Sequence, residues 1–156
     1  MVTLHRPSNV DEPDRLHAIA SALATIAERR PVVFTIHPRT AARIASMGIN
    51  LGKVRQLAPI RYMEMLDLVD GAYAVVTDSG GLQEETTALG VPCLTVRENT
   101  ERPVTITEGT NRLVPDPRAL PDAVERVERP ANPRRPEGWD GHAGDRVIEA
   151  IVSFRR

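Results

Sequence analysis

The segment 77–85, with the sequence TDSGGLQEE, combines residue types that can bind phosphate and ribose. It is typical of a strand end, a Gly-Gly turn and a helix start. At such a turn Ser79, Gly80 and Gly81 leave backbone N–H groups free for a phosphate. Glu85 follows one helical turn later, and its carboxylate can lean back to accept hydrogen bonds from sugar hydroxyls. A nucleotide-sugar supplies both groups, so we predict that this segment binds one.

A second segment, NTERP at 99–103, places one arginine beside a proline. Pro103 stiffens the backbone, and a well-held Arg102 above the turn could neutralise a leaving diphosphate. The alternative is a surface ion pair of Arg102 with Glu98 or Glu101, an interaction worth about 0–1 kcal/mol.

Histidines follow two of the expected strands. His5 and Arg6 end the first strand, where they could bind phosphate or transfer a proton, and His37 ends the second. With Asp78 the two histidines could ligate a metal, but no HxxxH or CxxC spacing supports this, and we expect no metal. No Walker A loop, serine-hydrolase elbow or GxGxxG loop is present, and we expect no cofactor.

The elements that must position these residues alternate between strands and helices. Short apolar runs predict strands at 2–5, 32–36, 54–57, 74–77, 92–96 and 112–114. Helical periodicity is clearest between the first two strands, where Pro13 suits the first turn and Asp11 or Glu12 the cap. The periodic residues are Leu16, Ile19, Ala20, Leu23, Ile26 and Ala27. Further helices are expected at 39–47, 61–70, 81–89, 119–128 and 142–154.

Glycine and proline set the boundaries of these elements. Gly71 and Gly90 suit left-handed C-caps of the helices that they follow. Pro130, Pro133 and Pro136 predict a linker at about 129–141, before the last helix.

Six strands alternating with helices predict a doubly wound, Rossmann-like parallel α/β sheet in a single domain, residues 1–156. In the strand order 3-2-1-4-5-6, the ends of strands 1, 2 and 4 meet at one edge of the sheet. The polar motifs should therefore converge on the edge where this fold binds ligands.

Composition narrows the functional classes. The net charge is −1, which disfavours a general nucleic-acid or membrane-surface binder. Cys93 is the single cysteine and sits in an apolar run, so we predict a buried thiol and no disulfide. No apolar run is long enough to span a membrane, and we expect a cytoplasmic protein. Because the chain begins directly on a strand, we expect a piece of a larger protein.

In order and in residue type, the motifs resemble the carboxyl-terminal domain of the non-hydrolysing UDP-N-acetylglucosamine 2-epimerases. The match extends over roughly the whole chain, and the pair DSGGxQEE and NTERP is its most specific part. The matching segments are 3–11, 36–40, 77–85, 90–92, 97–103 and 109–114.

The resemblance implies a two-domain GT-B architecture, of which this chain is the UDP-binding half. Ser79, Gly80 and Gly81 would hold the diphosphate, Glu85 the ribose and Arg102 the phosphate side.

His5 would be the catalytic residue, near the diphosphate and the reacting sugar. Ile60 and Met65, in the turn 59–62 and the helix after it, would contact uracil. Arg6 and His37 would belong to a possible second nucleotide-sugar site.

The implied reaction inverts C2 of UDP-GlcNAc to give UDP-ManNAc, by elimination of UDP and its readdition. In the family the acidic catalytic residues lie on an amino-terminal domain that this chain lacks. We therefore expect weak UDP binding and no epimerisation by the chain alone. A homodimer is implied for the full-length protein.

Three alternatives stay open. One is the donor-binding domain of a GT-B glycosyltransferase, which also places a carboxylate on ribose and a helix N-terminus on diphosphate. Another is a non-enzymatic nucleotide-binding module. The last is an epimerase of a related UDP-2,3-diacetamido sugar.

Overall fold

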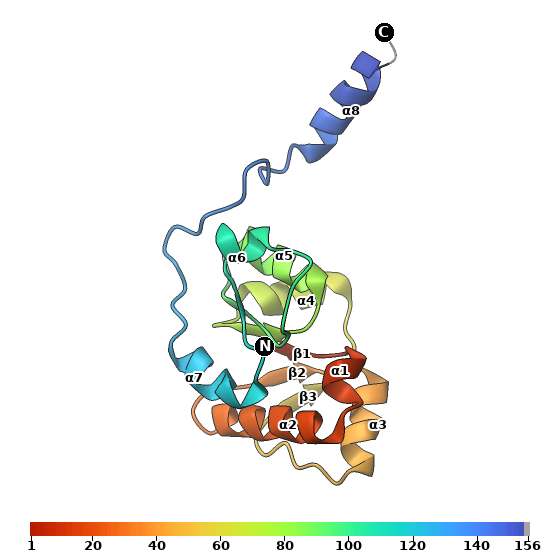
Figure 1. Ribbon diagram of the computed structural model, residues 1–156, viewed down its shortest axis with the longest axis vertical. Coiled ribbons are helices and arrows are strands. Elements are labelled where there is room, and N and C mark those ends of the chain that lie inside the picture. Colours follow the sequence, from red (N-terminus) through yellow and green to blue (C-terminus); the bar gives the residue numbers. More distant parts are fainter. Residues whose placement is uncertain (155–156) are drawn as a thin grey trace.

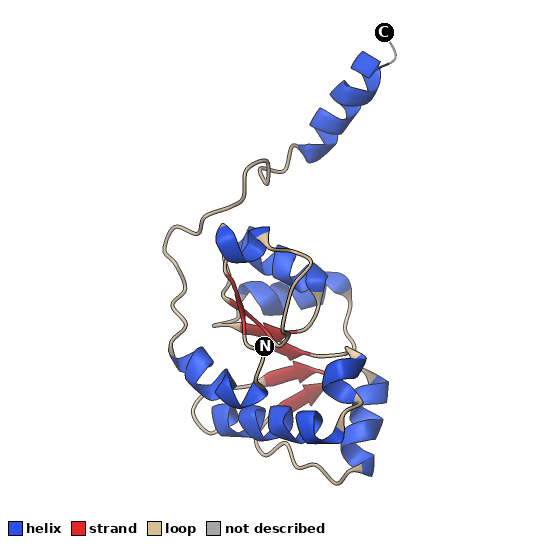
Figure 2. Ribbon diagram, viewed as in Figure 1, coloured by secondary structure: helices blue, strands red, loops and turns tan. Residues whose placement is uncertain are grey.

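The computed structural model describes residues 1–154 and contains one parallel sheet of six strands. Their order is β3-β2-β1-β4-β5-β6, which confirms the predicted doubly wound α/β class and its strand order. The strands are β1 (Val2–Thr3), β2 (Val33–Thr35), β3 (Arg55–Leu57), β4 (Val75–Thr77), β5 (Cys93–Thr95) and β6 (Asn111–Leu113). Figure 2 shows them as the central layer of the molecule.

Helices cover both faces of this sheet (Figure 1). The helices at the sheet are α1 (Pro7–Val10), α2 (Pro13–Ala27), α3 (Pro38–Ser46), α4 (Tyr62–Asp70), α5 (Gly80–Leu89), α6 (Val104–Thr107) and α7 (Leu120–Glu125), with a 3-10 turn at Pro117–Ala119. A last helix, α8 (Ala143–Phe154), lies apart from them. On one face Leu16, Ile19 and Leu23 of α2 pack in a buried cluster with Phe34 of β2. On the other face a second cluster joins α4, β4 and α5.

The first strand is shorter than predicted because the chain leaves the ladder early at the carboxyl edge of the sheet. β1 pairs with β4 only at Val2 and Thr3, and two residues later the backbone N–H of His5 donates to the side chain of Asp78 instead. The first strand therefore ends at Thr3 rather than at residue 5.

Several sequence-based boundaries were wrong. Gly71 ends α4 with φ −75°, a right-handed conformation, because the chain continues into a tight turn in which Ala72 donates to Val69. Gly90, by contrast, has φ 70° and is the predicted left-handed cap. Glu12 stands at the N-cap of α2, but its side chain makes no capping hydrogen bond. The helix predicted at 119–128 is confined to Leu120–Glu125.

The short helices α1 and α6 were not predicted, because four residues are too few for a periodic pattern. Both immediately follow a polar motif at the carboxyl edge of the sheet. They turn the chain back toward the sheet and hold the motif before them in place.

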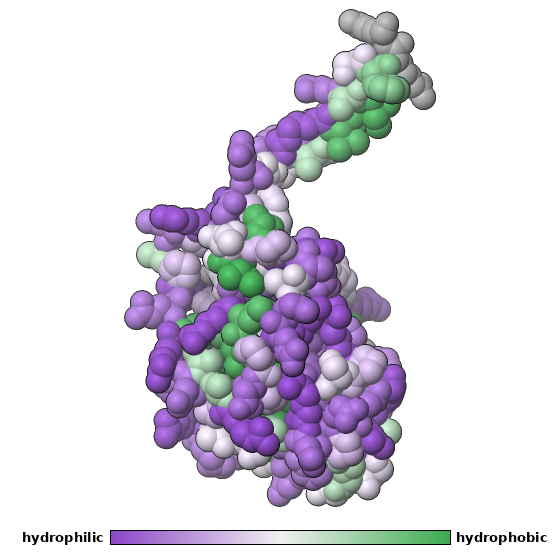
Figure 3. Space-filling view, in the orientation of Figure 1, coloured by the Kyte–Doolittle hydropathy of each residue, from purple (hydrophilic) through white to green (hydrophobic). Residues whose placement is uncertain are grey.

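α8 stands away from the sheet at the end of an irregular segment (Figure 1). Its exposed apolar side chains form one side of the helix in Figure 3, and they include Val147, Ile148, Ile151 and Val152. Within residues 1–154 no helix combines the length and apolarity that a membrane span requires.

Candidate functional site

The predicted site residues lie where β1 and β4 end, at the carboxyl edge of the sheet. Asp78 organises this edge, because its side chain is fully buried and accepts hydrogen bonds from three donors. The donors are the backbone N–H groups of His5 at 3.1 Å and Arg6 at 2.9 Å, and the Asn9 amide at 2.9 Å. The Nδ1 atom of His5 lies 3.1 Å from the same carboxylate. Asp78 therefore fixes the position of the candidate catalytic residue His5.

Sequence reasoning considered Asp78 only as a metal ligand and missed this organising role. Within the described part of the chain, no group of three or more His, Cys, Asp or Glu side chains is placed to hold a metal ion. The organising role of Asp78 could have been predicted from its position in the sequence, as a single carboxylate between a buried strand and a Gly-Gly turn. A charge at such a position needs several hydrogen-bond donors from neighbouring loops.

The Gly-Gly turn opens α5, with Ser79 at the N-cap and Gly80 and Gly81 as the first two helical residues. The side chain of Ser79 makes no capping hydrogen bond. Within residues 1–154 the backbone N–H groups of Gly80, Gly81 and Leu82 donate no hydrogen bond. Together with the helix dipole, three free donors favour an anion at this point.

Glu85 lies on the next turn of α5 and faces the start of α4. The hydroxyl of Tyr62 donates to its carboxylate at 3.3 Å, and the negative charge of Glu85 raises the pKa of that phenol. Ile60 precedes α4 and Met65 lies on it, both half-buried. The structure thus brings the predicted uracil-contacting segment beside the predicted ribose-binding carboxylate.

Among residues 1–154, Arg102 forms an ion pair with neither Glu98 nor Glu101, although its Nη1 donates to the carbonyl oxygen of Glu101 at 3.3 Å. Its Nε atom lies 2.8 Å from Oε1 of Glu84 on α5, which makes an ion pair whose geometry falls outside that of a hydrogen bond. Glu98 and Glu101 are nearer in sequence, but the chain turns at Pro103 and carries the guanidinium to α5. Arg102 is therefore held beside the same helix as Glu85.

A buried amide network fixes the loop that carries Arg102. Gln83 Oε1 accepts from Thr100 Oγ1 at 2.5 Å and from Asn111 Nδ2 at 3.1 Å, and Asn111 also donates to Thr105 at 3.0 Å. The network joins α5, the NTERP loop, α6 and β6. Sequence reasoning missed it because its members lie up to 28 residues apart and are individually unremarkable polar residues.

Glu101, in the same loop, joins two arginines across the edge of the sheet. Its carboxylate lies 2.9 Å from Arg6 and 2.6 Å from Arg97. Arg6 also donates through Nε to the carbonyl oxygen of Asp78 at 2.9 Å. Hydrogen bonding to its own backbone N–H and to Arg97 lowers the pKa of Glu101 to about 2.

His37 is separate from this cluster in its interactions. Its Nδ1 atom accepts the backbone N–H of Arg39 at 3.2 Å and so caps α3, while Arg6 bonds to Asp78 and Glu101. The two residues predicted for a second nucleotide-sugar site share no partner, and that role stays a prediction.

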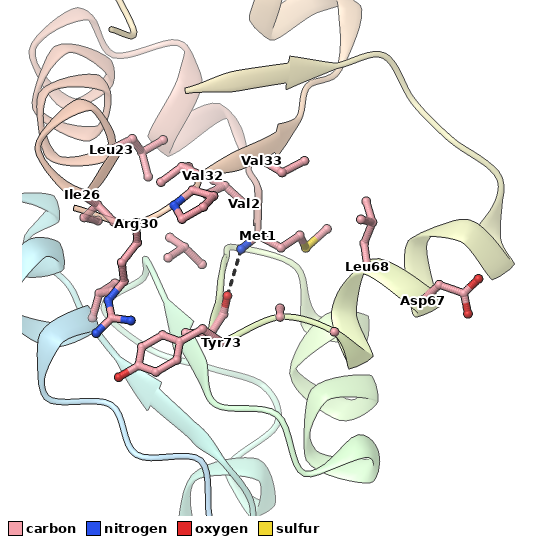
Figure 4. A pocket seen from close by; sticks show the side chains of 16 residues that line it. Met1, Val2, Leu23, Ile26, Arg30, Val32, Val33, Asp67, Leu68 and Tyr73 are labelled. Carbon is pink, nitrogen blue, oxygen red and sulfur yellow. Dashed lines mark hydrogen bonds between the residues drawn. The ribbon is translucent and has the colours of Figure 1, made fainter. Parts of the chain in front are cut away.

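A cavity lies at the opposite, amino edge of the sheet (Figure 4). It measures about 390 Å³ and is lined mainly by apolar side chains, among them Leu23, Val32 and Leu68. Its polar features include the Met1 ammonium, which donates to the Ala74 carbonyl oxygen at 3.0 Å, and Arg30, which stacks 4.1 Å above the ring of Tyr73. The candidate site residues at the carboxyl edge take no part in lining this cavity.

The family model described as UDP-N-acetylglucosamine 2-epimerase matches residues 1–152. The chain belongs to the UDP-N-acetylglucosamine 2-epimerase family. This confirms the resemblance that the motifs indicated.

Relatives show how much of an epimerase is present. The chain is 38% identical to the UDP-N-acetylglucosamine 2-epimerase of Methanocaldococcus jannaschii, over 97% of this chain and 44% of that protein. The structure of that enzyme in complex with UDP-GlcNAc and UDP superposes with a TM-score of 0.84, at 38% identity over 97% of this chain and 44% of that one. The UDP-2,3-diacetamido-2,3-dideoxy-D-glucuronate 2-epimerase of Pseudomonas aeruginosa is 43% identical over 73% of this chain and 32% of that protein. This epimerase-family chain thus spans less than half the length of these relatives.

Proposed function

We propose that this chain is the UDP-binding half of a UDP-N-acetylglucosamine 2-epimerase, with its site at the N-terminus of α5. The observation that carries the proposal is the group of three free N–H donors at Gly80, Gly81 and Leu82, flanked by Arg102 and Glu85. The diphosphate would accept from these donors and from Ser79. The positive end of α5 would stabilise its charge.

The remaining parts of UDP extend along α5 toward α4. Glu85 would accept from the ribose hydroxyls, releasing Tyr62, which it now binds at 3.3 Å. Ile60 and Met65 would flank the uracil. Arg102 would exchange Glu84 for a phosphate oxygen, an acceptor that suits a guanidinium.

The reaction then needs two stages. In the first, the proton on C2 of the sugar leaves and the C1–O bond to UDP breaks, giving a 2-acetamidoglucal and UDP. In the second, the C1–O bond re-forms and C2 receives a proton on the opposite face. This half would stabilise UDP as it leaves and returns, and His5, held by Asp78, would lie beside the reacting sugar.

The carboxylates that move the C2 proton would come from the other half, which corresponds to the part of the relatives that the chain does not span. We therefore expect the 156-residue chain to bind UDP without interconverting UDP-GlcNAc and UDP-ManNAc. Turnover of UDP-GlcNAc by the purified chain would contradict this part of the proposal.

A second candidate substrate is a UDP-2,3-diacetamido uronic acid. This substrate is favoured by the P. aeruginosa epimerase of that sugar, which is 43% identical to the chain across a segment that covers 73% of it. Because the residues named above contact UDP rather than the sugar, both substrates fit the same site.

Calorimetric titration with UDP tests the proposal. Loss of one charge-assisted hydrogen bond in Glu85→Ala or Arg102→Ala should weaken binding by about tenfold or more. Glu108→Ala and Arg135→Ala remove the same charges at exposed positions outside α5 and the loop 97–103, and they should bind like the parent chain. Equal affinity in all five proteins would refute the assignment, as would the absence of binding at millimolar UDP.

A further inference from the structure

Glu101 occupies the place in the site where a ligand anion would be expected. Its carboxylate bridges Arg6 and Arg97, at 2.9 Å and 2.6 Å, although the three residues come from two separate loops. The same carboxylate lies against the first residue of α5: a Cβ atom placed on Gly80 would be 3.0 Å from Glu101 Oε1. The Glu101 carboxylate thus lies beside the free N–H donors of the proposed diphosphate site.

The charges around Glu101 are those that a phosphate needs. Arg97 keeps only 13% of its side chain exposed, so its guanidinium cannot easily find another acceptor in solvent. Arg6 is fixed by its second bond, from Nε to the carbonyl oxygen of Asp78. Two positioned guanidinium groups and a helix N-terminus converge on one carboxylate that is itself 43% exposed.

We propose that Glu101 is an internal placeholder that holds Arg6 and Arg97 and must move away when a ligand diphosphate binds at α5. The inference rests on the proposed function, which puts the diphosphate at this helix. A carboxylate and a diphosphate repel each other, so both cannot occupy the space between Gly80 and the two arginines. Arg6 and Arg97 would then transfer from Glu101 to phosphate oxygens, so both become ligand-binding residues.

The placeholder has a thermodynamic consequence. Part of the affinity of the arginines for phosphate is offset by breaking their bonds to Glu101. The empty site, in turn, keeps its arginines paired and oriented. Because hydrogen bonding holds the pKa of Glu101 at about 2, the carboxylate stays ionised near neutral pH.

Affinity measurements with Glu101→Gln test the inference. This variant keeps the shape of the side chain and removes the charge, and it should bind UDP and inorganic pyrophosphate about fivefold more tightly than the parent chain. Glu98→Gln is the matched control: it removes a charge from the same loop, at an exposed position without an ion pair among residues 1–154, and should change neither affinity. A merely structural role of Glu101 would weaken binding, so a gain separates the two.

The outcomes distinguish this inference from the proposed function. If Glu85→Ala loses UDP but Glu101→Gln binds it no more tightly than Glu98→Gln, the site stands and the placeholder is refuted. If Glu101→Gln gains affinity for pyrophosphate but binds UDP no more tightly than pyrophosphate, the uridine part of the ligand contributes no affinity. The placeholder then stands and the UDP site is refuted. If Glu101→Gln binds neither ligand at millimolar concentration, the placeholder is refuted as well.

Discussion

Replacing Asp78 should damage stability and the site together, because one buried carboxylate holds the loop that carries His5 and Arg6. Asp78→Ala removes the acceptor for two backbone N–H groups and for the Asn9 amide. Asn9 is itself fully buried, so its freed N–H cannot turn to water. The backbone donors lie nearer the surface, where the side chain of His5 is 53% exposed.

The magnitude follows from these three donors. A buried donor without an acceptor costs about 1–3 kcal/mol, and the two backbone groups regain part of that from water. Asp78→Ala should therefore lower the free energy of unfolding by about 3–5 kcal/mol, in the range found when one partner of a buried charge pair is removed. Asp78→Asn keeps the shape and one acceptor oxygen, and it should cost about 1–2 kcal/mol.

Urea unfolding followed by circular dichroism measures the effect, provided that the m-value stays constant. Asp67→Ala, at an exposed position on α4, is the control and should change the free energy of unfolding by no more than about 0.5 kcal/mol. A loss below about 1 kcal/mol in Asp78→Ala would refute the reasoning. It would mean that the loop 5–9 does not depend on this carboxylate.

Further predictions concern groups outside the binding cluster. Burial raises the pKa of the Cys93 thiol to about 11, so a thiol reagent should label it only when urea unfolds the chain; rapid labelling in native buffer would contradict its burial. Gly90→Ala should cost more free energy of unfolding than Gly48→Ala, because both have positive φ but only a side chain at 90 overlaps the ring of Pro133. The extra cost of Gly90→Ala should vanish when Pro133 is replaced by glycine. An equal cost for Gly90→Ala and Gly48→Ala would show that the linker does not pack against Gly90. Burial lowers the pKa of the Met1 ammonium from 8.0 to about 6, so the unfolded chain binds more protons between these values. The free energy of unfolding should therefore rise by about 2 kcal/mol from pH 6 to 8. An acetylated amino terminus should lose that rise in urea unfolding measured across the same pH range, and an unchanged rise would assign it to another group.

Much of the fold could be predicted because its signals are local. The helix at 13–27 shows itself by apolar residues three and four apart, and the buried strands by continuous apolar runs. Alternation of the two then restricts a chain of this kind to a parallel sheet with right-handed crossovers. The predicted ends of elements were wrong where a long-range hydrogen bond competes with the local pattern. At His5, for example, the backbone N–H donates to Asp78 instead of to the neighbouring strand.

For the site, the motifs predicted a cluster at the carboxyl edge of the sheet, but they offered Arg102 the wrong ion-pair partners. Residue types alone placed Ser79, Gly80 and Glu85 at one helix start, since they are neighbours along the chain. Arg102, by contrast, was matched to nearby acids, and its actual partner Glu84 comes from α5. Local sequence contains no signal for such a choice.

The sequence by itself determined the class of sheet, the order of its strands and the family, because periodic burial and contiguous motifs are properties of short segments. Only the tertiary structure decided which charges meet. Glu101 and Arg6 stand 95 residues apart in the chain, and Asp78 and His5 stand 73 apart. Ion pairs and hydrogen bonds act over a few ångströms, so distant residues interact only after the sheet has brought the ends of β1 and β4 together.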